Sequence, residues 1–199
     1  MEMIQAYIDW TRTSCDSIDP GQVSRLIDLL MEARKDGRRI FILGNGGSAA
    51  TASHFCEDLG KCTLRSLDDN LRFKVISLTD NLPYVTAWAN DNGYDLVFEQ
   101  QLRNIGEPGD VVVGISASGN SPNVVRAIEY ANTRSMVTVG MTGFSGGKLK
   151  DIARHSVHVP ISDYGMAENM HMIVVHIIVN RTTKLVAGEE TGKDATKPA

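Results

Sequence analysis

An apolar run that leads straight into a loop of serines and glycine is the strongest constraint on how this chain folds. Residues 110–115 read Asp-Val-Val-Val-Gly-Ile, a run typical of a strand buried on both faces. Ser116, Ser118 and Ser121 follow this run, and a helical segment comes next. Their hydroxyls can donate to phosphate oxygens beside the free amides of a helix start, which attract anions. The pattern therefore predicts a phosphate cradle at the end of a core strand.

A second loop of the same kind lies nearer the start of the chain. Residues 38–43 form a short apolar run, and Gly44-Asn45-Gly46-Gly47-Ser48 then opens a helical stretch over 49–60. Both loops contain small side chains and many hydrogen-bond donors. Two strand-to-helix loops of this type indicate one anionic ligand of about the size of a sugar, held between them.

Composition excludes several classes of protein. The chain has 199 residues, of which 42% are hydrophobic, so it can bury a sizeable core as one domain. A net charge of -4 with interspersed signs leaves no basic stripe, and we expect no nucleic-acid partner. No apolar run approaches the roughly 20 residues that span a bilayer, so we expect no membrane association. Cys15, Cys56 and Cys62 form an odd, unpaired set that favours a reduced cytoplasm.

The order of apolar patterns predicts the fold class. Two amphipathic helices are expected within residues 1–36, and helical segments then separate strands at 38–43, 73–78, 110–115, 136–141 and 156–160. Strands that alternate with helices predict an α/β fold with a parallel sheet covered on both faces. A ligand binds such a sheet at the carboxyl ends of its strands.

Three further segments carry weaker predictions. Residues 82–104 show two helical patterns broken at 90–93, where Asn-Asp-Asn-Gly is a strong turn signal. Residues 167–185 are nearly all apolar and predict a helix that is buried or packs against a partner chain. Residues 188–199 are short and polar, and we expect them to be disordered.

Candidate chemical groups gather on two of the predicted helices. His54 and Asp58 are four residues apart on the helix after the glycine loop, so their side chains share one face and could hold a metal or pass a proton. Glu168, His171 and His176 interrupt the apolar C-terminal helix, where buried polar groups need partners. His171 points away from His176 around the helix, so we interpret it as structural.

The spacing of Glu168 and His176 raises a question of geometry. Eight residues at 1.5 Å rise separate their backbones by roughly 12 Å along a helix axis. If both belong to one site, a neighbouring subunit has to supply one of them.

Two nucleotide-binding interpretations fit the glycine loop less well. Gly44, Gly46 and Ala49 match the G-x-G-x-x-A form of a dinucleotide fingerprint, but Asp80 lies later than the expected spacing of about 20 residues. The chain also begins with helices instead of a strand. A Walker P-loop is excluded because no Gly-Lys-Ser/Thr ending follows the loop.

Four motifs together resemble the sugar isomerase (SIS) domain family, and most closely the phosphoheptose isomerases. They are Gly44-Asn45-Gly46-Gly47-Ser48, Asn90-Asp91, residues 114–121 and Gly146-Gly147-Lys148. The resemblance runs in order through residues 1–187. It implies a single SIS domain there, with a flavodoxin-like three-layer sandwich around a five-stranded parallel sheet. It also implies conversion of sedoheptulose 7-phosphate to a heptose 7-phosphate through an enediol, bound zinc, and a homotetramer with active sites between subunits.

The resemblance assigns a role to each matching position. Asp58 and His176 would be catalytic, and zinc would be bound by His54, Asp58, Glu168 and His176. The sugar phosphate would contact Asn45, Gly46, Gly47, Ser48, Asn90, Asp91, Ser116, Ala117, Ser118, Ser121 and Glu168.

Three positions depart from the family pattern. Asp58 stands where a glutamate is usual, Glu168 where a glutamine is usual, and Ala117 where a hydroxyl residue is usual. The shorter Asp58 retracts the carboxylate by roughly 1 Å, a displacement that can cost about 100-fold in rate. Besides this isomerase, two alternatives therefore stay open: a non-catalytic SIS protein that binds phosphosugars or protein partners, and an isomerase for a different sugar phosphate.

Overall fold

Five parallel strands form the centre of the molecule, in the order β2-β1-β3-β4-β5. The computed structural model describes residues 1–188. The strands are β1 (Arg39–Gly44), β2 (Lys74–Ser77), β3 (Val111–Ser116), β4 (Val137–Thr142) and β5 (His155–His158). Each lies within a few residues of its predicted place. The predicted α/β fold with a five-stranded parallel sheet is confirmed.

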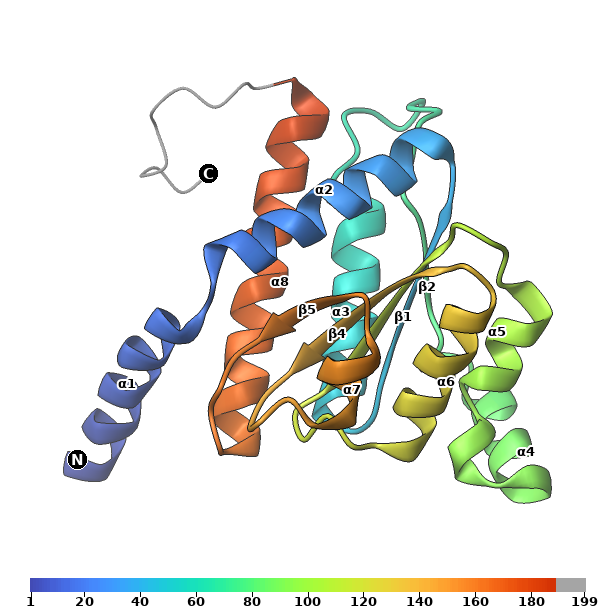
Figure 1. The fold of residues 1–199 in the computed structure, drawn as a ribbon. Coiled ribbons are helices and arrows are strands. Elements are labelled where there is room, and N and C mark those ends of the chain that lie inside the picture. The colour runs from blue at the N-terminus through green and yellow to red at the C-terminus, as the bar shows by residue number, and fades with distance from the viewer. Residues whose placement is uncertain (189–199) are drawn as a thin grey trace.

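Helices cover both faces of this sheet, as Figure 1 shows. One layer consists of α2 (Pro20–Asp36), α3 (Gly47–Lys61) and α8 (Tyr164–Ala187), which share one apolar core with the sheet. The other layer contains α5 (Glu99–Ile105), α6 (Pro122–Thr133) and α7 (Gly147–Ile152). Helix α4 (Leu82–Asn92) and the 3-10 turn η2 (Tyr94–Leu96) lie beside α5 and α6.

Alternation along the strands explains why both faces need a cover. Ile40 and Ile42 of β1 pack into the core beneath α2, α3 and α8, whereas Phe41 and Leu43 pack into the opposite core. All four side chains are fully buried. A strand buried on both faces reads as a continuous apolar run, which is the signal that located β1 and β3 in the sequence.

The connections reverse direction between β1 and β3. The chain leaves β1 into α3 on one face of the sheet, and it leaves β3 into α6 on the other face. Open α/β sheets bind ligands at the carboxyl ends of the strands where such a reversal occurs. The glycine loop and the serine loop follow these two neighbouring strands.

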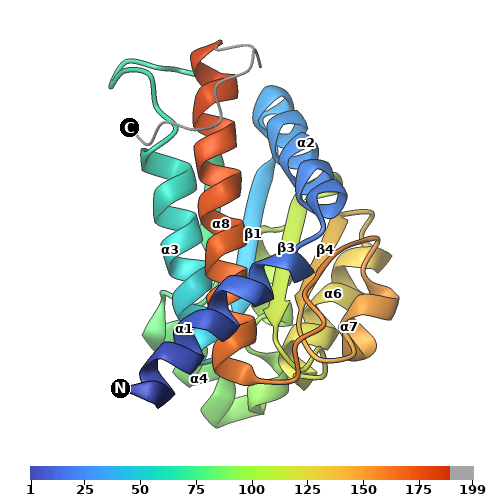
Figure 2. The same ribbon diagram turned by 90° about the vertical axis from the view of Figure 1, so that its left-hand side faces the viewer.

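The N-terminal helix α1 (Glu2–Ser14) stands apart from the sheet, as Figure 1 shows, and it crosses in front of α8 in Figure 2. A short 3-10 turn, η1 (Cys15–Ser17), joins it to α2. Asp19 caps α2 by accepting the amide of Gly21 at 2.7 Å, with Pro20 in the first turn. Within residues 1–188, no helix is both long and apolar enough to cross a membrane. Residues 189–199, which include most of the predicted disordered tail, lie outside the part of the chain described.

The helix boundaries differ from the predictions in two places. Helix α3 begins at Gly47 instead of residue 49, because Gly46 and Gly47 both adopt positive φ and turn the chain into the helix at once. Asn90 to Asn92 belong to the last turn of α4, and the helix ends at Gly93 with φ of 111°. The predicted turn is therefore present, but only Gly93 of the four residues interrupts the helix.

His171 is buried in the layer of α8, as its structural interpretation requires. It is 0% exposed, and neither ring nitrogen has a hydrogen-bond partner among the described residues. Burial lowers the pKa of His171 to about 4, an effect that the nearby main chain of Thr142 partly opposes and a charge on His158 would increase. The neutral imidazole is therefore the form that the fold accepts.

We predict that His171 makes the fold sensitive to acid. An unfolded histidine has a pKa near 6.5, so below that pH the unfolded chain binds a proton that the folded chain does not. Stability should fall as the pH drops from about 6.5 toward 4, by roughly 2–3 kcal/mol. Urea unfolding of His171→Leu at pH 7 and pH 4.5 should show a smaller loss than the wild type. The matched variant of the less buried His155, His155→Leu, should keep most of it. An unchanged loss in His171→Leu would contradict the prediction.

Candidate active site

The serine loop at the end of β3 presents three hydroxyls. Ser116 and Ser121 lie with their hydroxyl oxygens 3.0 Å apart, and Ser121 is the N-cap residue of α6. Its side chain makes no capping hydrogen bond and contacts the Ser116 hydroxyl instead, so the two hydroxyls lie together at the start of this helix. The Ser118 hydroxyl accepts the amide of Asn120 at 3.3 Å and keeps its own proton to donate. The loop therefore has the donors of the predicted phosphate cradle.

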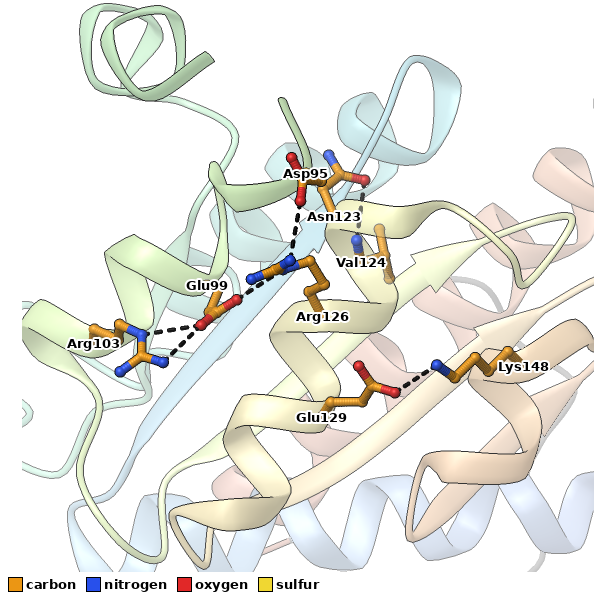
Figure 3. A network of polar contacts seen from close by, with 8 residues as sticks. All are labelled: Asp95, Glu99, Arg103, Asn123, Val124, Arg126, Glu129 and Lys148. Carbon is orange, nitrogen blue, oxygen red and sulfur yellow. Dashed lines mark hydrogen bonds and ion pairs between the residues drawn. The ribbon is translucent and has the colours of Figure 1, made fainter. Parts of the chain in front are cut away.

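The Gly146-Gly147 motif shapes this loop from behind. The amide of Leu149 donates to the Gly119 carbonyl at 2.8 Å. A Cβ atom on Gly119, which has φ of 68°, would lie 1.8 Å from the Gly146 carbonyl oxygen. Lys148 turns away and pairs with Glu129 on α6 at 2.6 Å (Figure 3). The glycines of this motif thus allow its backbone to approach that of the serine loop. The side chain of its lysine is directed away from the predicted phosphate cradle.

Ala117 faces the protein interior. Its side chain is 5% exposed, and its carbonyl accepts the amide of Gly143 at 2.8 Å. The position therefore offers a ligand main-chain groups at most.

The glycine loop carries a carboxylate at the start of α3. A Cβ atom on Gly47 would lie 2.2 Å from a carboxylate oxygen of Glu168, so Glu168 rests directly on the first residue of this helix. The partial positive charge of a helix start favours a carboxylate there. Ser48, next along the loop, is buried. Because Glu168 already supplies a negative charge here, the serine loop is the better of the two loops for a phosphate.

Helices α3 and α8 run side by side in the same direction, as Figure 2 shows. Three contacts mark their register. Gly47 meets Glu168, the ring of His54 meets the ring of His176, and the Thr183 hydroxyl lies 3.5 Å from the Cys62 carbonyl. Successive contacts are separated by seven or eight residues on each helix, which is two helical turns. The register explains how residues about 120 positions apart in the sequence become neighbours.

The contact between His54 and His176 brings three potential metal ligands together. Nε2 of His54 lies 3.2 Å from Oδ2 of Asp58, and Nε2 of His176 lies 3.9 Å from the same oxygen. The two Nε2 atoms are 3.5 Å apart. All three ligand atoms lie within 4.8 Å of one another. The histidine side chains are about half exposed, at 44% and 54%, so a ligand can reach the group.

The structure brings together three of the four predicted metal ligands. Glu168 is two helical turns away, roughly 10–12 Å along the axis. It stays with Gly47 and is not part of the group of ligand atoms formed by His54, Asp58 and His176. Its place near a metal remains a prediction, and its place at the glycine loop is what the contacts show.

The thiol of Cys62 donates a hydrogen bond to the other carboxylate oxygen of Asp58. Its sulfur lies 3.6 Å from Oδ1, one turn further along α3. Burial, followed by the charges of Asp58 and Glu57, raises the pKa of Cys62, so the thiol keeps the proton that it donates. The carboxylate of Asp58 therefore directs Oδ2 toward the two imidazoles.

Asn90 and Asp91 lie at the exposed end of α4. The amide of Asn90 donates to the carboxylate of Asp91 at 2.8 Å. The contact from this segment to the glycine loop comes from a residue that was not predicted, since the Tyr94 hydroxyl donates to Oδ1 of Asn45 at 2.9 Å. Asn123 also bonds Asn45 and was missed as well. The sequence could have indicated Asn123 only as a polar residue just after the serine loop.

Comparison with known proteins identifies the family. The model of the SIS domain matches residues 6–143. A probable phosphoheptose isomerase of Thermoplasma acidophilum is 40% identical over 153 residues, which cover 77% of this chain and 82% of that protein. The phosphoheptose isomerase of Geobacter metallireducens is 37% identical over 164 residues, covering 82% and 85%. The chain belongs to the phosphoheptose isomerase family of SIS domain proteins.

A solved family member has the same architecture. The phosphoheptose isomerase of Neisseria gonorrhoeae matches with a TM-score of 0.83 and 29% identity, over 91% of this chain and 97% of that one. The resemblance that the loop motifs predicted is thereby confirmed for the fold as well as for the family.

We predict that the serine loop of this phosphoheptose isomerase family member depends on Gly119. Gly119→Ala forces a methyl group against the Gly146 carbonyl and should lower the free energy of unfolding by more than about 2 kcal/mol. Gly188→Ala is the matched control, because Gly188 has φ of 77° but no atom of residues 1–188 lies within 4 Å of the added Cβ. The control should cost about 1 kcal/mol from its left-handed backbone alone. Equal losses in urea unfolding of the two variants would contradict the close approach of the loops.

Proposed function

We propose that this protein is a sugar-phosphate isomerase that converts sedoheptulose 7-phosphate to a heptose 7-phosphate. The observation that carries the proposal is the position of the Asp58 carboxylate on α3, within 4 Å of the imidazoles of His54 on α3 and His176 on α8. Relatives named phosphoheptose isomerase at 37–40% identity support the same activity. The remaining steps follow from what each group can do.

The serine loop holds the phosphate end of the substrate. Hydroxyls of Ser116, Ser118 and Ser121 donate to phosphate oxygens, assisted by the start of α6. The sugar is surrounded by Asn90, Asp91, Glu168 and the glycine-loop residues Asn45, Gly46, Gly47 and Ser48, and Ala117 lies beside the phosphate. Glu168 accepts hydroxyl protons, because a carboxylate is an acceptor only. Its negative charge on α3 keeps the phosphate at the serine loop.

Asp58 removes a proton from one carbon and protonates the next. As a general base it takes the proton from the carbon beside the carbonyl, which leaves an enediol. The resulting carboxylic acid exchanges this proton with solvent and then protonates the neighbouring carbon. His176 transfers the proton between the two oxygens, so that the carbonyl and the hydroxyl exchange places. The hydrogen bond from Cys62 keeps Oδ2 of Asp58 facing this step.

The same three residues fit a zinc ion. Two imidazoles and one carboxylate are a donor set that catalytic zinc sites use, with a further position left open for a ligand. Zinc–nitrogen bonds of about 2.0–2.1 Å place tetrahedral ligands roughly 3.3 Å apart. Two separations in this group, 3.2 and 3.5 Å, are close to that value, and the third, 3.9 Å between His176 and Asp58, is longer. His54, Asp58 and His176 would hold the ion, and Glu168 would join only by moving. A bound zinc would supply polarisation of the substrate carbonyl.

We also propose a homotetramer in which a neighbouring subunit covers α1. This helix leaves apolar side chains in solvent, with Ile4 64%, Ile8 41% and Trp10 41% exposed. Tyr7 of the same helix accepts a hydrogen bond from Asn169, next to Glu168, so the uncovered face lies beside the site. Light scattering of the purified protein measures the number of subunits in the assembly.

We also propose a cytoplasmic location for this protein. The three cysteines are free, in keeping with a reducing compartment.

Turnover of sedoheptulose 7-phosphate tests the proposed activity. We predict an aldose product from the wild type, and a loss of at least about 1,000-fold in kcat for Asp58→Asn, which keeps the shape but removes the base. Asp28→Asn, on the distant helix α2, is the matched control and should act as the wild type does. Tight binding of the sugar phosphate without turnover by the wild type would favour the non-catalytic alternative.

Zinc binding is predicted independently of activity. Calorimetry of dialysed protein should show one strong zinc site per chain, weakened at least 100-fold in His176→Ala, because three ligands become two. His155→Ala removes a histidine from β5, away from the group, and should bind zinc as the wild type does. Equal affinity in the two variants would exclude His176 as a ligand.

A further inference from the structure

The side chain of Asn45 is held from two sides. Its Nδ2 donates to Oδ1 of Asn123 at 2.8 Å, and Nδ2 of Asn123 donates back to Oδ1 of Asn45 at 2.9 Å. The Tyr94 hydroxyl donates to the same Asn45 oxygen at 2.9 Å. Asn123 is 1% exposed, so this reciprocal amide pair is anchored in the protein interior.

The orientation of both amides follows from a main-chain group. The amide of Val124 donates to Oδ1 of Asn123 at 3.0 Å, which identifies that atom as the oxygen (Figure 3). Asn45 must then present its nitrogen to this oxygen and its own oxygen to the nitrogen of Asn123. Both lone pairs of the Asn45 oxygen are used, by Asn123 and Tyr94. One N–H of Asn45 remains, so its side chain can only donate to a ligand.

Tyr94 is itself attached to the helix that carries Asn123. Asp95, the next residue, accepts from Arg126 of α6 at 3.1 Å. Arg126 also donates to the buried Glu99 at 3.0 Å, and Arg103 donates twice to the same carboxylate (Figure 3). The hydrogen bond with Glu99 raises the pKa of Arg126, so this anchor keeps its charge. The exposed turn η2 is thereby held against α6.

We infer that Asn123 and Tyr94 are positioning residues, which act through Asn45 to aim its one free N–H at an oxygen of the bound sugar. The inference rests on the proposed function and extends it. Three segments that come from different parts of the chain, namely the glycine loop, η2 and the start of α6, meet at this junction. The junction fixes the glycine loop relative to the serine loop, which is the distance that a sugar phosphate has to span.

A double-mutant cycle tests the inference. Tyr94→Phe removes one hydroxyl from a ring that is 54% exposed, and kcat/KM for sedoheptulose 7-phosphate should fall roughly 3- to 10-fold. In an Asn45→Ala background the same change should have no further effect, because Tyr94 acts only through Asn45. Tyr84→Phe is the matched control, since the Tyr84 hydroxyl accepts from Asn104 outside the junction, and it should match the wild type. Independent losses that multiply would overturn the inference.

A measurement without ligand separates this inference from the proposed activity. The side-chain amide protons of Asn45 and Asn123 should give shifted, slowly exchanging NMR resonances, and Tyr94→Phe should move those of Asn45 while Tyr84→Phe leaves them in place. If the wild type does not turn over the sugar, the proposed function fails. The resonances then still test whether Tyr94 orients Asn45. Asn45 resonances that Tyr94→Phe leaves unchanged would refute it.

Discussion

The parallel packing of α3 against α8 is the constraint on which the chemistry of this protein depends. Both helices belong to one layer, and apolar residues such as Phe55 and Val175 bury their inner faces in a shared core. The two-turn register of their contacts then leaves polar pairs along the outer seam. Glu168 falls at the glycine loop, and His176 falls beside His54 and Asp58. A shift of either helix by one residue would rotate its groups by about 100° and separate them.

The sheet fixes the other half of the site. Because β1 and β3 are neighbours whose helices leave on opposite faces, the glycine loop and the serine loop lie at the carboxyl ends of neighbouring strands. Close backbone contacts at Gly119 and the junction around Asn45 then hold each loop in place. In the function that we propose, phosphate binding and proton transfer rest on different parts of the fold, joined by α3.

The sequence predicted the sheet well because each central strand is buried on both faces and reads as an apolar run. It also predicted the pair His54 and Asp58, because four residues along a helix return to the same face. That His176 joins this pair depends on how two distant helices pack, which no local pattern encodes. Glu168 was grouped with the same ligands by resemblance, yet the rise of α8 places it two turns away. Asn123 and Tyr94 were missed because amide and hydroxyl pairs between segments 78 and 49 residues apart have no sequence period.

We propose that Asp58 removes a proton from one carbon of the substrate, exchanges it with solvent and protonates the neighbouring carbon. Incubation of the protein with sedoheptulose 7-phosphate in D₂O, followed by NMR of the sugar, tests it most directly. The account predicts deuterium at the carbon next to the aldose carbonyl, at a rate that falls in Asp58→Asn as turnover does. A product that forms without solvent deuterium after many turnovers, or exchange that persists unchanged in Asp58→Asn, would contradict the account.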